Sequence, residues 1–375
     1  MPVTIAVVRE TAPNERRVAL TPEVAKKLAK LGGTLAMQAG AGEPASLPDA
    51  AYPDVEKLPD ANSALGRADV LFKVQPPTLE EIAALKEGAI LISYLQPHLS
   101  PERTRALRDR KVTAFAMELL PRTTRAQAMD VLSSQAGMAG YKAVLIAAQA
   151  APKFFPMLTT AAGTIRPSKV LIVGAGVAGL QAIATARRLG AQVEGFDVRP
   201  EVKEQIESLG AKFLDLGVSA AGTGGYAREL SPEERLEQQR RLGEHVKNVD
   251  VIVTTAAVPG RAAPKIITRT MVEGMRAGAV IVDLAAESGG NCEVTVPGQT
   301  VVHQGVTVIG PLNLPSMGAM HSSEMYSRNL FNFASLMLKD GALNLDWEDE
   351  LIAKTCLTHA GEIKHEPTRK LVDGA

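Results

Sequence analysis

The sequence predicts an α/β protein of two Rossmann-like domains, each a doubly wound parallel sheet, separated by a cleft. Three observations lead to this prediction. The chain has 375 residues, enough for two domains of about 150 residues each. Short apolar runs alternate with helical patterns, which is typical of a parallel sheet covered on both faces. Two such series occur, one on each side of a nearly all-apolar helical stretch at 134–151.

The first series begins with a strand-like run and a well-marked helix. Thr21 suits a helix N-cap, Pro22 suits the first helical position, and Gly32 ends the helix after the apolar repeat. Strands are expected at 3–8, 35–38, 69–74, 89–95 and 112–117, with further helices at 79–86 and 101–110.

The second series begins after Pro152. Strands are expected at 169–173, 192–197, 212–214, 251–254, 279–283 and 306–309, and helices from the glycine-rich turn to 189, at 200–209 and at 233–246. A last helix at about 323–339 is expected to return to the first domain, by analogy with other two-domain chains. We therefore predict one domain from 1–133 with 320–375 and a second from 134–319.

The composition excludes several classes of protein. Lys+Arg and Asp+Glu both number 41, which argues against a nucleic-acid partner bound by bulk charge. Only two cysteines occur, Cys292 and Cys356, so a disulfide scaffold is excluded. Neither they nor the six histidines show metal-ligand spacing, and no metal is expected. We see no signal peptide or spanning segment and expect a cytoplasmic protein.

The sharpest motif is VLIVGAGVAGLQA, which places three glycines in the G-x-G-x-x-G spacing between an apolar strand and an Ala-rich helix. Gly174 allows a tight turn, Gly176 lets the backbone approach a pyrophosphate, and Gly179 allows close helix–strand packing. Asp197 follows eighteen residues beyond Gly179 and suits the adenosine ribose hydroxyls while repelling a 2′-phosphate. The motif favours NAD over NADP, although Arg199 is close by. The plainer interpretation is a glycine-packed turn with an ordinary acidic residue.

A second polar segment runs from Pro121 to Gln135. If this stretch is helical, Gln127, Asp130 and Ser134 share one face. Gln and Ser side chains offer the donor and acceptor that a nicotinamide carboxamide requires, and Arg122 or Arg125 suits a phosphate. The alternative is a polar helix N-terminus with surface arginines.

Three loops complete the candidate site. The run 222–227 ends in glycines and one aromatic, Tyr226, as a lid would; it also suits an exposed connection. Residues 254–260 and 283–291 follow predicted strands, at the sheet edge where ligands of open α/β sheets bind.

These residues together resemble one superfamily, the alanine dehydrogenases and the NAD(H)-binding component of proton-translocating nicotinamide nucleotide transhydrogenases. The resemblance covers nearly the whole chain, through ERRVALTPE, QAGAGE, LFKVQPP, PRTTRAQAMDVLSSQ, the glycine motif and VDLAAESGGNCE. The runs RAQ-x-MD-x-LSSQ and AGTGGYARE are similar to the transhydrogenase branch.

The resemblance implies roles for individual residues. Gln127 and Asp130 would be the catalytic pair, acting with Arg122 and Ser133 on the nicotinamide and its ribose phosphate. Tyr226 would be the lid aromatic. The full set of implied NAD(H)-binding residues is Arg122, Thr123, Thr124, Arg125, Gln127, Asp130, Ser133, Gly174, Ala175, Gly176, Val177, Ala178, Gly179, Asp197, Val198, Arg199, Gly225, Tyr226, Gln238 and Ala257.

The two branches differ in the chemistry they require. An alanine dehydrogenase must move a proton and hold a substrate carboxylate. Its motif arginine is present as Arg17, but its second lysine is Gln75, its histidine is Gln96, and its late Asp is Glu287. Gln does not titrate, whereas hydride transfer between two nicotinamides requires no proton at the reacting carbons.

The transhydrogenase branch also implies partners. The chain ends without hydrophobic helices, so it resembles a separately encoded peripheral subunit at the inner membrane. NADP(H) and the proton channel would lie on membrane-embedded partner subunits, and a homodimer is expected. The alternatives are an alanine-type amino-acid dehydrogenase with an altered pocket and an NAD(H) sensor without catalysis.

Overall fold

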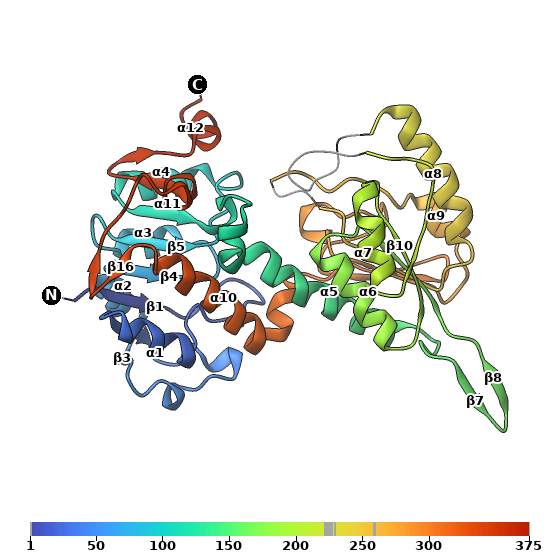
Figure 1. Ribbon diagram of the computed structural model, residues 1–375, viewed down its shortest axis with the longest axis horizontal. Coiled ribbons are helices and arrows are strands. Elements are labelled where there is room, and N and C mark those ends of the chain that lie inside the picture. Colours follow the sequence, from blue (N-terminus) through green and yellow to red (C-terminus); the bar gives the residue numbers. More distant parts are fainter. Residues whose placement is uncertain (1, 221–227, 229, 258–259, 375) are drawn as a thin grey trace. The chain divides into compact units, whose positions relative to one another are not determined.

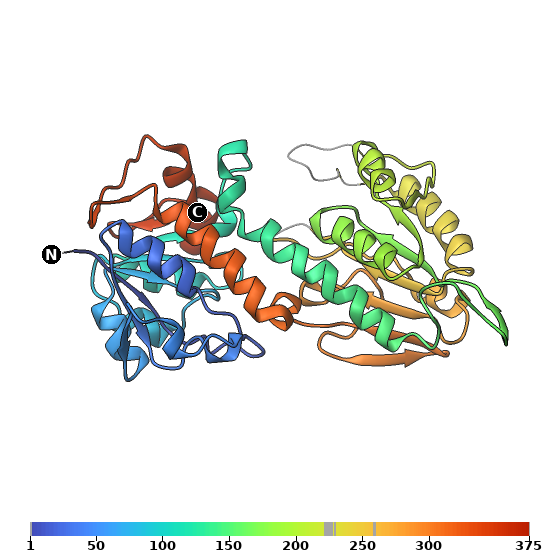
Figure 2. The same ribbon diagram turned by 60° about the horizontal axis from the view of Figure 1, so that its bottom comes forward.

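The computed structural model describes residues 2–220, 228, 230–257 and 260–374. They form two compact units: unit 1 contains residues up to Gln135 and from Ser316 onward, and unit 2 contains Ala136–Pro315. In each unit, helices cover both faces of a mostly parallel sheet (Figures 1 and 2). The predicted α/β class with two doubly wound sheets is confirmed.

Unit 1 has an eight-stranded sheet in the order β19-β18-β6-β5-β4-β1-β2-β3. Its parallel strands are β1 (Thr4–Val7), β2 (Thr34–Gln38), β3 (Glu56–Leu58), β4 (Val70–Phe72), β5 (Ile90–Ser93) and β6 (Thr113–Ala116). This order is that of a doubly wound sheet. β18 (Cys356–His359) and β19 (Glu362–Ile363) extend it in antiparallel fashion beside β6.

Alternation along the strands builds two cores in unit 1. Ile5 and Val7 face one core and Ala6 and Val8 the other, because successive side chains of a strand point to opposite faces. The first face is covered by α1 (Pro22–Lys30), α10 (Ala319–Ala334) and α11 (Glu350–Thr355). The second is covered by α2 (Ala61–Arg67), α3 (Leu79–Ala84) and α4 (Pro101–Asp109), and α12 (Glu366–Asp373) lies near the C-terminus.

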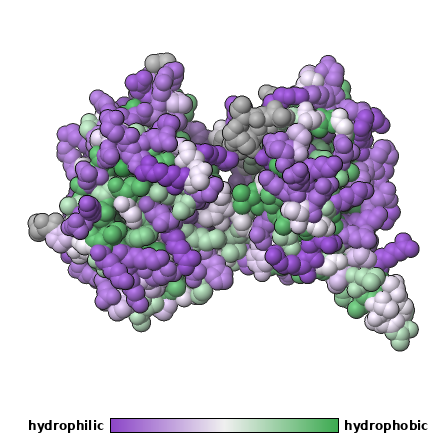
Figure 3. All heavy atoms as spheres, in the orientation of Figure 1, coloured by the Kyte–Doolittle hydropathy of each residue, from purple (hydrophilic) through white to green (hydrophobic). Residues whose placement is uncertain are grey.

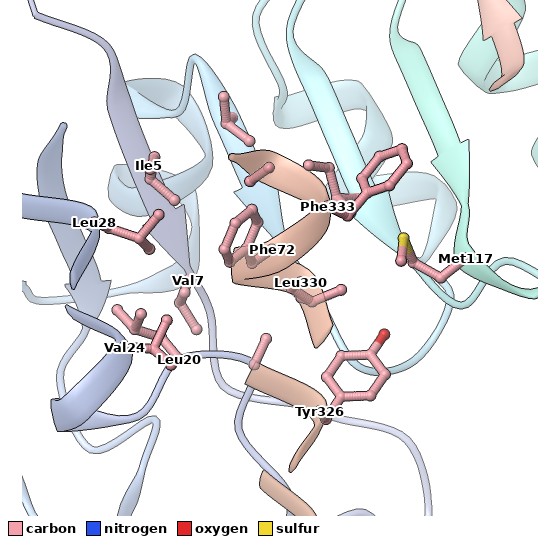
Figure 4. Packing of buried hydrophobic residues seen from close by; sticks show 14 of the residues in the cluster. Ile5, Val7, Leu20, Val24, Leu28, Phe72, Met117, Tyr326, Leu330 and Phe333 are labelled. Carbon is pink, nitrogen blue, oxygen red and sulfur yellow. The ribbon is translucent and has the colours of Figure 1, made fainter. Parts of the chain in front are cut away.

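The helix α10 joins the C-terminal part of the chain to this core. Leu330 and Phe333 point into the packed cluster (Figure 4), and the Phe333 ring meets Phe115 edge-on at 5.2 Å between centroids. The hydroxyl of Tyr326 donates to the carbonyl of Lys73 at 2.9 Å. Burial of a large apolar side chain stabilises a fold by about 2 kcal/mol, so this helix is an integral part of unit 1.

Unit 2 has a seven-stranded sheet in the order β11-β10-β9-β12-β13-β15-β14. Its parallel strands are β9 (Lys169–Val173), β10 (Gln192–Phe196), β11 (Lys212–Phe213), β12 (Val251–Thr254), β13 (Val280–Asp283) and β15 (Val306–Ile309). β14 (Thr300–His303) is an antiparallel edge strand. One face carries α5 (Val131–Ala150), α6 (Val177–Arg188) and α7 (Lys203–Ser208), the other α8 (Pro232–Val246) and α9 (Arg269–Gly274).

Short elements complete the two units. Two hairpins are β7 (Leu158–Thr160) with β8 (Gly163–Ile165), and β16 (Leu338–Lys339) with β17 (Ala342–Leu343). The 3-10 helices are η1 (Glu43–Ala45), η2 (Asp49–Ala51), η3 (Met117–Leu119), η4 (Thr124–Met129), η5 (Pro200–Val202), η6 (Ala286–Ser288) and η7 (Leu314–Gly318). In the part of the chain that the structure describes, no helix has both the length and the apolar character needed to cross a membrane.

Two glycines of α5 provide a matched test of helix packing in unit 2. A Cβ on Gly140 would lie 2.0 Å from the carbonyl oxygen of Ala178, whereas a Cβ on Gly137 would meet no described atom within 4 Å. We expect Gly140→Ala to lower the free energy of unfolding by about 2 kcal/mol, because the helices must separate. Gly137→Ala should leave it unchanged or raise it by up to about 1 kcal/mol. Urea unfolding measures both; equal midpoints would contradict this packing argument.

Candidate functional site

The glycine turn of unit 2 leaves little room for side chains at two of its three glycines. Gly174 follows β9 with φ +96°, a backbone conformation that favours glycine. A Cβ on Gly179 would lie 1.8 Å from the carbonyl oxygen of Gly174, so α6 reaches the strand only because this position has no side chain. At Gly176, which is the N-cap of α6, a Cβ would meet no described atom within 4 Å. The middle glycine is therefore open to a ligand, as a pyrophosphate requires.

Asp197 stands directly beside this turn, at the end of β10. Its carboxylate accepts a hydrogen bond from the backbone N–H of Ala175 at 2.7 Å. The residue is only 8% exposed and is paired with the Arg199 guanidinium at 2.7 Å. An acidic side chain fixed next to the pyrophosphate turn has the position and the acceptor atoms that an adenosine ribose requires.

Two buried polar residues fix the neighbouring loops. The carboxylate of Asp283, at the end of β13, accepts the hydroxyl of Thr254 at 2.9 Å and the N–H of Cys292 at 3.0 Å. The side chain of Asn291 accepts the N–H of Ala256 at 3.0 Å and donates to its carbonyl at 2.7 Å. These bonds fix the backbone just before Ala257, which is exposed.

The structure therefore brings three predicted groups together, because β10, β9 and β12 are neighbours in the sheet. The glycine turn, Asp197 and residues 254–257 all follow the carboxyl ends of these strands, where ligands of open α/β sheets bind. Val177 and Ala178 lie in the first turn of α6, which has no side-chain cap, so its N–H groups suit a phosphate. Gln238 is buried in α8, while Gly225 and Tyr226 lie outside the described residues.

The predicted polar segment of unit 1 is not one continuous helix. Residues Thr124–Met129 form the 3-10 helix η4, and Asp130, at ψ 95°, interrupts it before α5 begins. The Asp130 carboxylate accepts the N–H of Ser133 at 2.9 Å and its hydroxyl at 2.6 Å. Asp often bonds to nearby backbone in this way and so competes with helix formation. Ser134 instead donates to Asn329 of α10 at 2.7 Å.

The other side chains of this segment differ in their environment. Arg122, Thr124 and Gln127 are exposed. Arg125 forms a two-point ion pair with Asp349, so its charge is already balanced within unit 1. The hydroxyl of Thr123 is buried and has no hydrogen-bond partner among the described atoms. Such an atom is costly unless a ligand or water completes it.

A closed polar cluster surrounds Arg17 in unit 1. Its guanidinium donates to both carboxylate oxygens of Glu15, at 2.8 and 2.6 Å, and to the side-chain oxygen of Gln135 at 2.8 Å. Gln75 also donates to Glu15, at 2.7 Å. Although burial alone would raise the pKa of the Glu15 carboxyl, the bonds and charge of Arg17 lower it to about 2. Arg17 is 7% exposed, so its charge is neutralised inside the fold.

Two further groups of buried charge lie near this cluster and were not predicted from the sequence. Lys73 contacts the carboxylates of Glu10 at 3.2 Å and Glu81 at 3.0 Å. Glu118 accepts backbone N–H groups of Leu95 and Gln96, and burial raises the pKa of its carboxyl to about 7. Their partners are distant in the sequence, so no local pattern could reveal them. Among the described residues, no group of three or more His, Cys, Asp or Glu could hold a metal ion.

Comparison with known families agrees with this geometry. The model of the alanine dehydrogenase/PNT N-terminal domain matches residues 6–139, and that of the alanine dehydrogenase/PNT C-terminal domain matches residues 143–366. The chain belongs to the alanine dehydrogenase/PNT family. Its family membership confirms the resemblance found in the sequence motifs.

Within the alanine dehydrogenase/PNT family, the chain is 46% identical to an NAD(P) transhydrogenase alpha subunit of Rhodospirillum rubrum, over 96% of this chain and 97% of that protein. It also resembles the crystal structure of transhydrogenase from Sinorhizobium meliloti, with a TM-score of 0.86, 41% identity and coverage of 97% and 99% of the two chains. An L-alanine dehydrogenase structure matches with a TM-score of 0.82 at 26% identity, over 99% of both chains. The family is one of oxidoreductases, and the transhydrogenase members are the more similar.

The buried Glu118 carboxyl leads to a pH-dependent prediction. The folded chain keeps the proton up to about pH 7, whereas the carboxyl of the unfolded chain, at its ordinary pKa of 4.5, releases it earlier. The native state is therefore progressively destabilised as the pH rises from 4.5 through 7. We expect Glu118→Gln to raise the free energy of unfolding by about 2 kcal/mol at pH 8 and to have little effect at pH 5.

Urea unfolding at both pH values measures this difference. The amide keeps a side-chain oxygen for the two N–H donors, so the variant removes only the charge. Exposed Glu348→Gln serves as the control and should show no gain at pH 8. A Glu118→Gln variant that is less stable than the parent at pH 8 would contradict the prediction.

Proposed function

We propose that this chain is the NAD(H)-binding peripheral subunit of a proton-translocating transhydrogenase. It would exchange hydride between NAD(H) on this chain and NADP(H) on a partner subunit, NADH + NADP⁺ giving NAD⁺ + NADPH. The observation that carries the proposal is a pair of features: an open dinucleotide turn in unit 2, and a unit 1 cluster with Gln75 and Gln96 in place of titrating side chains. The 46% identity to a transhydrogenase subunit supports it.

The nucleotide would be held mainly by unit 2. The N–H groups of Ala175–Gly179 suit the pyrophosphate, and the carboxylate of Asp197 suits the adenosine ribose. Val198, Arg199, Gly225, Gln238 and Ala257 are proposed as further contacts. In unit 1, Arg122, Thr123, Thr124, Arg125 and Ser133 are proposed to bind the nicotinamide end. When bound, NADH supplies the hydride.

Gln127 and Asp130 are proposed as the catalytic pair. Hydride transfer between two nicotinamides requires the reacting carbons at about 3–3.5 Å with water excluded, so the chain has to orient the ring. Gln127 is exposed and offers both a donor and an acceptor. The rotamer of Asp130 is fixed by Ser133, which leaves the carboxylate in a defined position.

Amino-acid dehydrogenation suits this chain less well. Such a reaction requires a cation free to bind a substrate carboxylate and a base to take a proton. Arg17 already pairs with Glu15, whose low pKa keeps that partner ionised. Gln75 donates to the same carboxylate and cannot exchange a proton. These contacts favour the transhydrogenase over the alanine-type enzyme.

The partners are part of the proposal. NADP(H) and proton translocation would belong to membrane-embedded subunits, with this chain at the cytoplasmic face of the inner membrane. A homodimer is supported by the β7–β8 hairpin, which projects from unit 2 and carries exposed hydrophobic residues (Figures 1 and 3). Met157 is 64% exposed and Ile165 46%. Exposed apolar groups on a projecting element are typical of an assembly surface.

The deciding experiment compares binding with turnover in the same preparation. The purified chain would be titrated with NADH by fluorescence and then given NAD⁺ with a panel of small amino acids that includes L-alanine. We expect NADH binding, no amino-acid-dependent NADH formation, and hydride transfer once an NADP(H)-binding partner subunit is added. Amino-acid turnover would establish a dehydrogenase, and binding without transfer to the partner would establish a sensor.

The catalytic pair gives a separate prediction. Gln127→Ala and Asp130→Asn should slow single-turnover hydride transfer at least tenfold but weaken NADH binding by less than threefold, since they act on ring orientation. Asp130→Asn keeps an oxygen that can accept the Ser133 N–H. Exposed Arg240→Met, in α8, is the control and should change neither quantity. Equal losses in affinity and rate would show that the two residues only bind the nucleotide.

A further inference from the structure

The carboxylate of Asp197 has no acceptor position to spare in this structure. One oxygen accepts the backbone N–H of Arg199 and its Nε–H, both at 2.9 Å. The other accepts the N–H of Ala175 at 2.7 Å and an Nη2–H of Arg199 at 2.7 Å. A carboxylate offers about four lone-pair sites, so ribose hydroxyls bind Asp197 only if one of these partners leaves.

Of the two partners, the side chain of Arg199 is the one that can leave. The Ala175 N–H belongs to the glycine turn, which is fixed by the backbone of the β9–α6 connection. The Arg199 side chain is 15% exposed and the Asp197 side chain 7%, so the guanidinium lies on the outer side of a buried carboxylate. Rotation of one long side chain exchanges its hydrogen bonds for those of a ribose.

The position of Arg199 also bears on the choice between NAD(H) and NADP(H). The two nucleotides differ by a phosphate on the ribose hydroxyl that lies next to Asp197. A guanidinium within hydrogen-bond distance of that carboxylate is adjacent to the same phosphate, and arginine binds phosphate well through paired N–H groups. With Asp197 present, binding that phosphate would leave a buried carboxylate unpaired and close to a dianion.

From these contacts, and on the basis of the proposed NAD(H) site, we infer that Arg199 is a specificity-determining residue whose ion pair with Asp197 withholds it from the 2′-phosphate of NADP(H). Discrimination against NADP(H) is then a property of the pair and not of the Asp197 charge alone. For a reaction that uses both nucleotides, this prevents the partner's nucleotide from occupying the NAD(H) site.

The test releases Arg199 by neutralising its partner. The full chain and its Asp197→Asn variant are titrated with NADH and NADPH by fluorescence. We expect Asp197→Asn to bind NADPH at least tenfold more tightly than the parent chain and NADH at least threefold less tightly. The double variant Asp197→Asn/Arg199→Met should lose the NADPH gain, returning to within threefold of the parent. Circular dichroism checks folding, and Asp197→Ser, whose hydroxyl can still accept the Ala175 N–H, replaces an unfolded Asn variant.

A matched control separates the Arg199 guanidinium from general positive charge. Lys203, which is exposed at the start of α7, is changed in Asp197→Asn/Lys203→Met, and this variant should keep the gain. The inference is overturned if Asp197→Asn gains no NADPH affinity, if the Arg199 double variant keeps the gain, or if the Lys203 variant loses it. A parent chain that binds neither nucleotide overturns the proposed function as well, so the two failures are distinguishable.

Discussion

The close approach of α6 to the end of β9 is the constraint on which the candidate site in unit 2 depends. The absence of a side chain at Gly179 lets the first turn of the helix rest against the carbonyl of Gly174. The same carbonyl accepts the hydroxyl of Thr255 at 3.0 Å, after the next strand, β12. Ala175, one residue further, binds Asp197 after β10. One steric requirement therefore holds the ends of three neighbouring strands in a single arrangement.

Unit 1 has the same doubly wound strand order but a different first connection. Where unit 2 passes from strand to helix through a short glycine turn, unit 1 uses a longer segment between Val7 and Pro22 that carries Glu10, Glu15 and Arg17. These side chains point inward and bind one another or Lys73 and Gln75. The fold alone therefore does not define a nucleotide site; the residues of the first strand–helix connection do.

Sequence reasoning succeeded where the signal is local. The glycine spacing, the preceding apolar strand and Asp197 lie within thirty residues and have one geometric meaning, so the turn was predictable. It failed where contacts are distant. Arg125 pairs with Asp349, and Arg17 with Gln135, across more than a hundred residues of sequence. At 127–134 the helical spacing was correct as a pattern, but Asp130 bonds to its own neighbour Ser133 and breaks the helix. The strands β18 and β19 were missed because they are short and pair at an edge.

The discontinuity of unit 1 has a consequence for how the chain is made. Synthesis from the N-terminus completes the single continuous segment of unit 2 before the ribosome reaches α10, β18 and β19. Until then, the edge of β6 has no partner on that side, and Phe115 lacks the ring of Phe333. An open strand edge is a site of aggregation, and domains fold as units as they emerge. The unit whose synthesis begins first is thus the last to become complete, and the segment from Ser316 onward protects the nascent protein.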